Sequence, residues 1–298
     1  MRQKSFSIRP VHDILLRGSL DVQLGLSQLR VATAEQLCRL YYPPGCIKAV
    51  KARQKELEDH GYIQHDVIPS REFRKPYYYT LTGKGARYLQ STGMDTDDAF
   101  RASREVDKHG LFIDHALELN DMIIAAALLK KGGSGFYLYN FIHEHSLKRH
   151  PYKATWRENG HSETHNLIPD ALLDFRYSDG QRQLRVPVLL EQDRGTEQQR
   201  YFRRRIRAYI AFLEAGAQQD MFGAQVVTIA FSTFAGDFRL AQMRQWAKQE
   251  LGSRDASIGQ SFVFANLSRP PEPHAVWLEP VWQMPFDGEP IALLSAMQ

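Results

Sequence analysis

Apolar residues in the first part of the chain recur at helical spacing. Several apolar residues of 11–29 fall on one face at helical spacing, for example Leu15, Val22, Leu26 and Leu29, which predicts an amphipathic helix. A second helix is expected after Thr33, because a threonine followed three residues later by Gln36 forms a capping-box pattern. A third helix is predicted over residues 47–60 and is expected to end at Gly61, since glycine commonly follows a helix C-terminus.

Strand patterns follow these three helices. Residues 62–68 and 76–82 are rich in β-branched and aromatic side chains and flank a basic tip at 69–75, which predicts a hairpin. A short helix is expected after Thr82. Helix, helix, basic helix and hairpin is the element order of a winged helix-turn-helix, and we predict that fold for residues 11–90.

The rest of the chain alternates between helix and strand patterns. Residues 91–107 lack apolar periodicity and are interpreted as a linker. Helices are predicted at 114–129, 198–213 and 238–251, and strands at 136–139, at 225–231, at 262–264 and in two apolar runs that begin at Leu167 and Val186. The polar, histidine-rich stretch at 140–166 is interpreted as a loop. This order predicts an α/β layered domain over residues 108–298, so the fold class is α/β, or α+β over the whole chain.

Composition agrees with two domains outside the membrane. The chain has 298 residues, 43% of them hydrophobic, and no apolar run of the roughly twenty residues that a spanning helix needs. Its N-terminus lacks the apolar core of a signal peptide. Cys38 and Cys46 are the only cysteines, so a disulfide framework is not expected. These features predict a cytoplasmic protein.

Positive charge is concentrated in the predicted winged helix. Residues 1–90 carry fifteen Lys and Arg against eight Asp and Glu, a net charge of +7, while the remainder carries −3. A basic module of this kind favours a polyanion partner, here double-stranded DNA. The residues predicted to contact DNA lie on the third helix and at the hairpin tip: Lys48, Lys51, Arg53, Lys55, Arg71, Arg74 and Lys75. Two alternatives stay open, a solvated helix face and a winged helix that binds a protein.

Carboxylates stand at or near the ends of the two apolar runs. Asp170 lies on the first run, and Glu191 and Asp193 lie on the second. Strand residues two apart point to the same side, so Glu191 and Asp193 can face one point, with Asp170 on a neighbouring strand. Such an oxygen cluster suits Mg²⁺, because crowded carboxylates repel one another without a cation. The alternative is ordinary acidic residues at strand ends.

Several of these motifs resemble the replication-relaxation family, from about residue 20 to 215. The matching segments are Ala34-Glu-Gln-Leu, Leu57-x-x-x-Gly61-Tyr-Ile, Tyr79-Thr-Leu-Thr-x-x-Gly85, His115-Ala-Leu-Glu-Leu-Asn120-Asp, and Pro169-Asp170 followed by Glu191-x-Asp193-x-Gly-Thr-Glu197. The resemblance implies a restriction-endonuclease-like second domain, whose signature is Pro-Asp followed by Asp/Glu-x-Lys.

The resemblance also implies roles for individual residues. Asp170 and Glu191 would ligate Mg²⁺ or Mn²⁺, and Glu118 would assist from the helix that opens the domain. The metal would lower the pKa of a bound water and stabilise the charge on the scissile phosphate. Apart from the resemblance, Asp193 or Glu197 could supply a base, which a metal-bound hydroxide does not strictly need.

The chain departs from this signature at the lysine. Asp193 stands at the expected position, and no lysine occurs between Lys153 and Lys248. Arg205, on the basic helix one turn before Tyr209, stands at what resembles the family's basic position. An arginine stays protonated, so it can position a water or neutralise phosphate charge but cannot act as a base.

Two functions therefore stay open. The first is metal-dependent, site-specific nicking or cleavage of DNA by a relaxase-like protein of a plasmid or mobile element. The second is a non-enzymatic DNA-binding regulator, or a replication or transfer accessory factor, with a degenerate nuclease fold. Double-stranded DNA is the expected partner, other replication, conjugation or transposition proteins are candidates, no membrane is expected, and a homodimer is left open.

Two further side-chain patterns have competing interpretations. His161 and His165 have the i, i+4 spacing of a helical zinc site, but the neighbouring Asn159-Gly160 favours a polar loop. Tyr209 could act as a nucleophile on DNA, yet its apolar neighbours Ile206 and Ile210 favour packing in the core.

Overall fold

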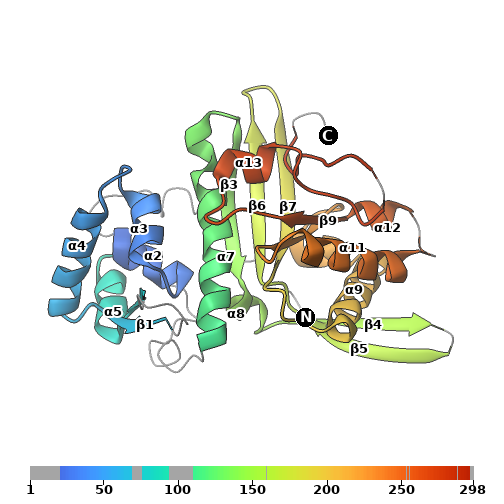
Figure 1. The fold of residues 1–298 in the computed structure, drawn as a ribbon, viewed down its shortest axis with the longest axis horizontal. Coiled ribbons are helices and arrows are strands. Elements are labelled where there is room, and N and C mark those ends of the chain that lie inside the picture. Colours follow the sequence, from blue (N-terminus) through green and yellow to red (C-terminus); the bar gives the residue numbers. More distant parts are fainter. Residues whose placement is uncertain are drawn as a thin grey trace. The chain divides into compact units, whose positions relative to one another are not determined.

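The chain forms two compact units, residues 1–128 and residues 129–298 (Figure 1). The structure is a computed structural model that describes residues 21–68, 76–93, 110–158, 160–252, 254, 256–286 and 288–295. Helices and a mixed sheet make the fold α/β overall, as the sequence predicts. No helix in these described ranges is long and apolar enough to span a membrane.

The first unit contains five described helices and one hairpin. The helices are α2 (Asp21–Leu29), α3 (Ala34–Tyr41), α4 (Ile47–Asp59), α5 (Gly83–Ser91) and α7 (Gly110–Leu128). Strands β1 (Ile63–Val67) and β2 (Tyr77–Leu81) pair antiparallel, so the predicted hairpin is confirmed. The left-handed backbone of Gly61, with φ of 71°, confirms the predicted end of α4. The predicted hairpin tip at 69–75 lies outside the described residues.

Two reciprocal hydrogen bonds between Thr33 and Gln36 stabilise the first turn of helix α3. Thr33 Oγ1 accepts a hydrogen bond from the Gln36 amide, and Gln36 Oε1 accepts one from the Thr33 amide, each at 3.1 Å. Because two otherwise unpaired amides are satisfied reciprocally, the capping box predicted from the sequence is confirmed.

Helix α7 belongs to the first unit, whereas the sequence analysis places the second domain's start at residue 108. The Gln36 side-chain amide reaches from α3 to the Leu117 carbonyl at 2.7 Å and to Asp121 at 3.0 Å. Asn120 donates to the carbonyls of Leu29 and Val31 at 3.1 and 2.6 Å. These buried hydrogen bonds hold α7 against the preceding helices. Separating the helices would leave buried donors and acceptors without partners, which destabilises the fold.

Thr33→Ala is expected to lower the free energy of unfolding by about 1 kcal/mol, since it removes the side-chain acceptor of the capping box. The measurement is urea denaturation of the full chain followed by circular dichroism. Thr33→Ser keeps a hydroxyl acceptor and is the matched control. Equal stability of the alanine and serine variants would contradict this prediction.

The second unit is built on a mixed five-stranded sheet in the order β3-β6-β7-β8-β9. Its strands are β3 (Phe136–His143), β6 (Ala171–Ser178), β7 (Gln183–Asp193), β8 (Thr228–Thr233) and β9 (Phe262–Asn266). The β3–β6 and β6–β7 pairs are antiparallel, and the β7–β8 and β8–β9 pairs are parallel. In the turn between β6 and β7, Asp179 accepts hydrogen bonds from the amides of Gln181 and Arg182.

Two long helices cover one face of this sheet. Helix α9 (Gln199–Glu214) connects β7 to β8, and α11 (Asp237–Leu251) connects β8 to β9. Their apolar side chains share one buried cluster with Leu172 of β6 and Leu189 of β7. Shorter helices complete the unit: η1 (Leu129–Gly132), α8 (Glu144–Leu147), α10 (Ala217–Phe222), α12 (Ala256–Gln260) and α13 (Pro273–Leu278). This arrangement places α9, which follows β7, and α11, which follows β8, over the same face of the sheet.

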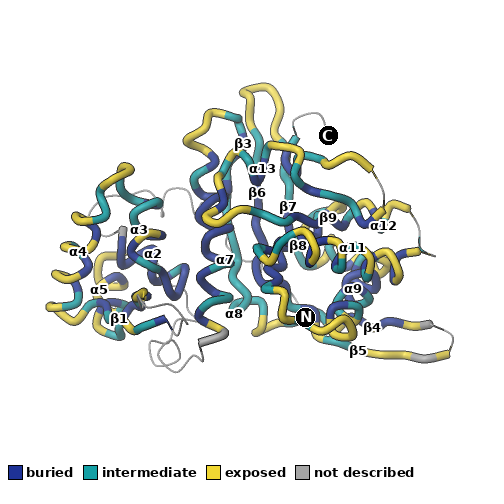
Figure 2. Tube along the Cα trace, viewed as in Figure 1, coloured by how far each residue is buried: buried dark blue, intermediate teal, exposed yellow. Residues whose placement is uncertain are grey.

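The histidine-rich stretch expected to be a loop is instead a separate antiparallel pair of strands. We call β4 (Tyr152–Glu158) and β5 (His161–Leu167) the ribbon (Figure 1). One side of the ribbon joins the core through Ala154, Trp156 and Leu167, which pack with α9. On β4 every second residue is buried or half-buried, whereas on β5 Leu167 is the one buried residue among the described side chains (Figure 2). The segment therefore lacks the overall hydrophobicity of the other strands.

Candidate functional site

The site lies where β6 begins and β7 ends. Ala171 pairs with Leu190, so the residues just beyond that pair, Asp170 and Glu191, stand side by side. Glu191 follows the core residue Leu189 by two positions, which places its side chain on the face that α9 and α11 cover. Asp170 Oδ2 accepts a hydrogen bond from the Gln192 amide at 2.8 Å. The register thus brings the two predicted metal ligands together at the carboxyl end of a parallel strand, the usual position of a site in such sheets.

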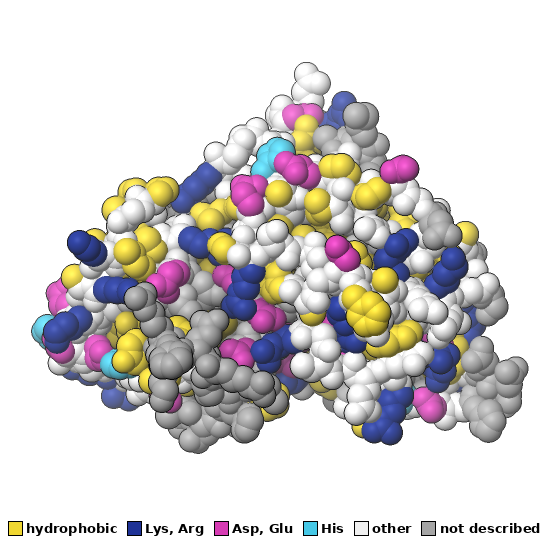
Figure 3. Space-filling model, in the orientation of Figure 1, with side chains coloured by type: hydrophobic (Ala, Val, Ile, Leu, Met, Phe, Trp, Pro, Cys, Tyr) yellow, Lys and Arg dark blue, Asp and Glu magenta, His cyan; other side chains and the backbone are white. Residues whose placement is uncertain are grey.

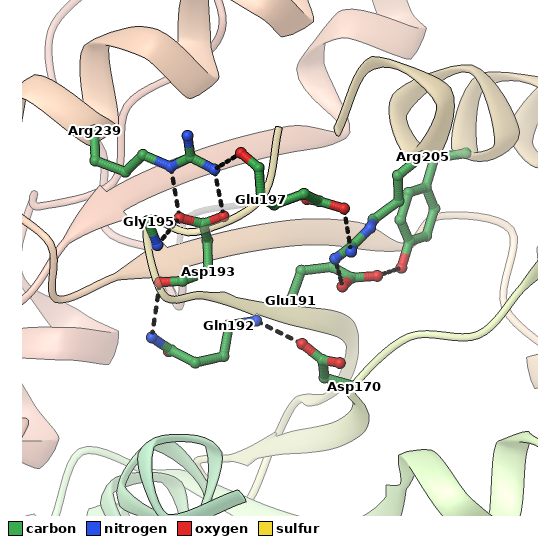
Figure 4. A network of polar contacts seen from close by, with 9 residues as sticks. Asp170, Glu191, Gln192, Asp193, Gly195, Glu197, Arg205 and Arg239 are labelled. Atoms are coloured by element: carbon green, nitrogen blue, oxygen red, sulfur yellow. Dashed lines mark hydrogen bonds and ion pairs between the residues drawn. The ribbon is translucent and has the colours of Figure 1, made fainter. Parts of the chain in front are cut away.

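Helix α9 supplies the groups that contact Glu191 (Figure 4). Arg205 Nη1 donates to Glu191 Oε2 at 2.6 Å, and the Tyr209 hydroxyl donates to Glu191 Oε1 at 2.5 Å. Because Arg205 and Tyr209 are four residues apart, they share one face of the helix. Arg205 Nη2 also donates to Glu197 at 2.7 Å. Four of the predicted site residues, Asp170, Glu191, Glu197 and Arg205, therefore form one cluster.

Burial raises the pKa of Glu191 from 4.5 to about 8. Only 1% of this residue is exposed, and the charge of Asp170 adds to the effect, although Arg205 and Tyr209 oppose it. Burial also raises the pKa of Glu197, with Asp193 adding to it. Burial disfavours the charge on Arg205, but the attraction of Glu191 and Glu197 is larger in sum and raises its pKa. The cluster is thus rich in acid and holds a guanidinium that stays charged.

The raised pKa of Glu191 predicts a loss of stability as pH rises. Between its unfolded pKa near 4.5 and its folded pKa of about 8, the folded state holds a proton that the unfolded state has released. Stability therefore decreases with pH across that window, by roughly 2 kcal/mol between about pH 6 and about pH 8.5. Urea denaturation in EDTA measures the slope. Glu191→Gln carries no titrating group there and is expected to lack this contribution, so equal slopes would refute the assignment.

Asp193 has a different cationic partner. It lies on the same face of β7 as Glu191, but Arg239 of α11 binds both of its oxygens at 2.7 Å. Asp193 Oδ1 also accepts a hydrogen bond from the Gly195 amide at 2.7 Å, and Arg239 donates to the Glu197 carbonyl at 3.0 Å. Figure 4 shows this pair beside the Glu191–Arg205 contact. Asp193 and Arg239 thus fix the loop that carries Glu197.

A pocket of about 400 Å³ opens onto Asp170 and Glu191. Its cations and hydrogen-bonding groups come from α9 and from the ribbon: Arg204, Arg205, Tyr201, His165 and Asn166. Tyr201 is 46% exposed at this pocket. Acids and cations that line one cavity are suited to a phosphodiester, which has negative oxygens and needs a nearby proton acceptor or cation for cleavage.

Sequence reasoning missed three of these contributors. Arg239 lies 46 residues from Asp193, and no local pattern links the two. Asn166 and Tyr201 reach the pocket only because the ribbon packs on α9.

The two competing side-chain interpretations have clear outcomes. His165 lies on a strand, where Glu163 and Arg204 contact it at 3.0 and 2.8 Å. Among the described residues no group of three or more His, Cys, Asp or Glu side chains could hold a metal ion. Tyr209 is fully buried with its hydroxyl on Glu191, as the packing interpretation expects.

The cations of α4 divide between two sides of the helix. Lys48, Lys51 and Lys55 are exposed and recur at i, i+3 and i+7, which places them on one stripe. Arg53 is on the other side and forms an ion pair with Glu56 at 2.7 Å, while Leu57 is buried. Figure 3 shows Lys and Arg side chains with acidic ones between them where α4 lies.

Arg71, Arg74 and Lys75 lie outside the described residues. Glu118 lies on α7 in the first unit, and its assisting role stays a prediction.

Comparison with known families adds to this geometry. The replication-relaxation family model matches residues 25–228, which spans parts of both units. The chain belongs to the replication-relaxation family. Membership gives it a role in replication or in the processing of mobile-element DNA. No curated protein and no solved structure matches the chain.

Proposed function

We propose that this replication-relaxation protein nicks or cleaves DNA at a specific site of a plasmid or other mobile element, in a metal-dependent reaction. The observation that carries the proposal is the convergence of Asp170, Glu191 and Arg205 in one open pocket at the strand ends. The order β3, β6, β7, α9, β8 supports a restriction-endonuclease-like core for the second unit.

The first unit is proposed to be a winged helix-turn-helix that locates duplex DNA. Helix α4 carries the exposed stripe of Lys48, Lys51 and Lys55, and the β1–β2 hairpin follows it. In this motif the basic helix enters the major groove while the hairpin contacts the phosphate backbone. The sequence places Arg71, Arg74 and Lys75 at the hairpin's basic tip, where they would serve that second contact.

The donor set at the pocket fits Mg²⁺ or Mn²⁺. Magnesium commonly takes one or two carboxylates and completes its shell with water and substrate phosphate, so Asp170 and Glu191 would hold it. Burial and the neighbouring Asp170 charge hold the pKa of Glu191 high, and a cation would relieve that repulsion. When bound, Mg²⁺ lowers the pKa of a water and stabilises the charge that builds up on the scissile phosphate.

The protein's own side chains would hold the acidic residues in position and neutralise charge on the phosphate. Arg205 holds Glu191 and Glu197 in place and presents a permanent positive charge to the phosphate. Glu197, whose pKa is raised by burial, is the better placed proton acceptor, because both oxygens of Asp193 are bound by Arg239. Asp193 is therefore assigned to support the loop.

A second candidate function is DNA binding without cleavage, by a regulator or accessory factor. One observation favours it: both oxygens of Glu191 already accept hydrogen bonds, from Arg205 and Tyr209. In that case Arg205 replaces the missing metal charge rather than assisting it, and the first unit performs the function.

Nicking of a supercoiled plasmid that carries the gene's own flanking DNA separates the two functions. The protein is incubated with Mg²⁺, Mn²⁺ or EDTA, and the same plasmid without the insert is the matched control. Open circles that require both the metal and the insert are expected. Tight binding of the insert with no open circles under any metal would leave the regulator.

A further inference from the structure

The outer face of the ribbon is polar, exposed and free of described acidic side chains. Lys153, Thr155 and Arg157 lie two residues apart on β4, so they point to the same side. Their directly paired partners on β5 are Asn166, Thr164 and Ser162. All six residues are exposed. This face therefore combines two cations with hydroxyl and amide groups.

The opposite face of the ribbon accounts for its packing. Ala154 and Trp156 are buried against α9, and Tyr152 contacts Phe212 of α9 ring to ring at 5.2 Å. Glu163 is the partner of Trp156 and lies on this inner side, where it is paired with His165 at 3.0 Å. On the outer face Thr155 and Thr164 hydrogen-bond to each other across the two strands at 3.0 Å, and the two cations beside them are exposed to an external partner.

The ribbon is continuous with the pocket. Lys153 pairs with Asn166, and Asn166 lines the cavity that contains Asp170 and Glu191. Arg157 lies four residues further along β4, roughly 13 Å away at the usual strand rise. One strand of B-DNA presents a phosphate about every 3.4 Å of helix axis, so the two cations would span roughly four nucleotides.

We propose that the outer face of the ribbon binds the phosphate backbone of the DNA next to the site of cleavage, through Lys153 and Arg157. Hydroxyl and amide side chains between the two cations add hydrogen bonds to phosphate oxygens, a contact class that positions DNA without reading its sequence. Two cations on a face that has no acidic residue among its described side chains are complementary to that backbone. This inference rests on the proposed function, since it extends the same site.

The test measures DNA affinity of the full chain against salt concentration by fluorescence anisotropy. Lys153→Gln/Arg157→Gln is expected to reduce the slope of log K against log salt by about 2 and to weaken binding by about tenfold for all sequences. Thr155→Lys adds a cation to the same face and is expected to increase the slope by about 1. Equal melting temperatures are expected, because the substituted side chains are exposed.

The matched control removes two exposed cations elsewhere in the second unit, Arg182 beyond the β6–β7 turn and Lys248 on α11. Arg182→Gln/Lys248→Gln is expected to keep the wild-type slope. Wild-type DNA binding with the same slope in both double variants would overturn the ribbon inference and leave the proposed function intact. Absence of DNA binding by the wild type would overturn both. Loss of binding to phosphatidylserine vesicles alone would assign the ribbon to an anionic membrane surface instead.

Discussion

Asp170→Asn is expected to lower the rate of metal-dependent nicking by about 10²- to 10³-fold, the range found when one preorganised electrostatic contact is removed. The amide is nearly the same size as the carboxylate, and its oxygen can still accept the hydrogen bond from the Gln192 amide. The negative charge that would hold the metal beside Glu191 is lost. The measurement is single-turnover nicking of the supercoiled plasmid with Mg²⁺.

The effect of Asp170→Asn should fall on the chemical step alone. DNA affinity is expected to stay equal or to rise, because the variant removes a negative charge beside the phosphate. Asp179→Asn is the matched control, since Asp179 lies in the turn at the other end of β6 and can keep its turn hydrogen bonds as an amide. Full nicking by Asp170→Asn would exclude Asp170 from the metal site.

Local signals account for most of the fold. The Thr33–Gln36 capping box, the glycine at the end of α4 and the two apolar runs are all properties of neighbouring residues, and the structure confirms each of them. The sequence did not predict the ribbon as strands, because its outer face is polar on both strands. The period-two pattern is carried by only a few buried residues, such as Ala154 and Trp156. Only packing against α9 makes those residues a strand face.

The meeting of Asp170 and Glu191 could be predicted because a hairpin fixes register. The short turn after β6 sets which residues pair, and two carboxylates just beyond Ala171 and Leu190 must then be neighbours. The boundary at α7 could not be predicted, since hydrogen bonds from Gln36 and Asn120 connect residues that are 81 and 91 positions apart. Asp193 and Glu191 have different cationic partners. That difference also depends on a residue distant in the sequence, Arg239, which binds Asp193.

Arg239→Met is expected to lower the free energy of unfolding by about 3 to 5 kcal/mol, the usual cost of removing one partner from a buried ion pair. The side chains of Asp193 and Arg239 are 5% and 7% exposed, so the remaining carboxylate would be left without its cation and away from water. The guanidinium also lies 4.9 Å from the Trp246 ring centroid, a contact that the methionine keeps only in part. Urea denaturation of the full chain measures the loss.

A second substitution separates the charge from the packing. Asp193→Asn/Arg239→Met removes both charges, so it is expected to recover most of the stability lost in Arg239→Met, because no unpaired buried charge remains. Nicking by the double variant is expected to stay low, since Arg239 also holds the Glu197 carbonyl and Asp193 the Gly195 amide. A double variant as unstable as Arg239→Met would show that the packing of Arg239 dominates. Full nicking by the double variant would show that Glu197 needs no support from this pair.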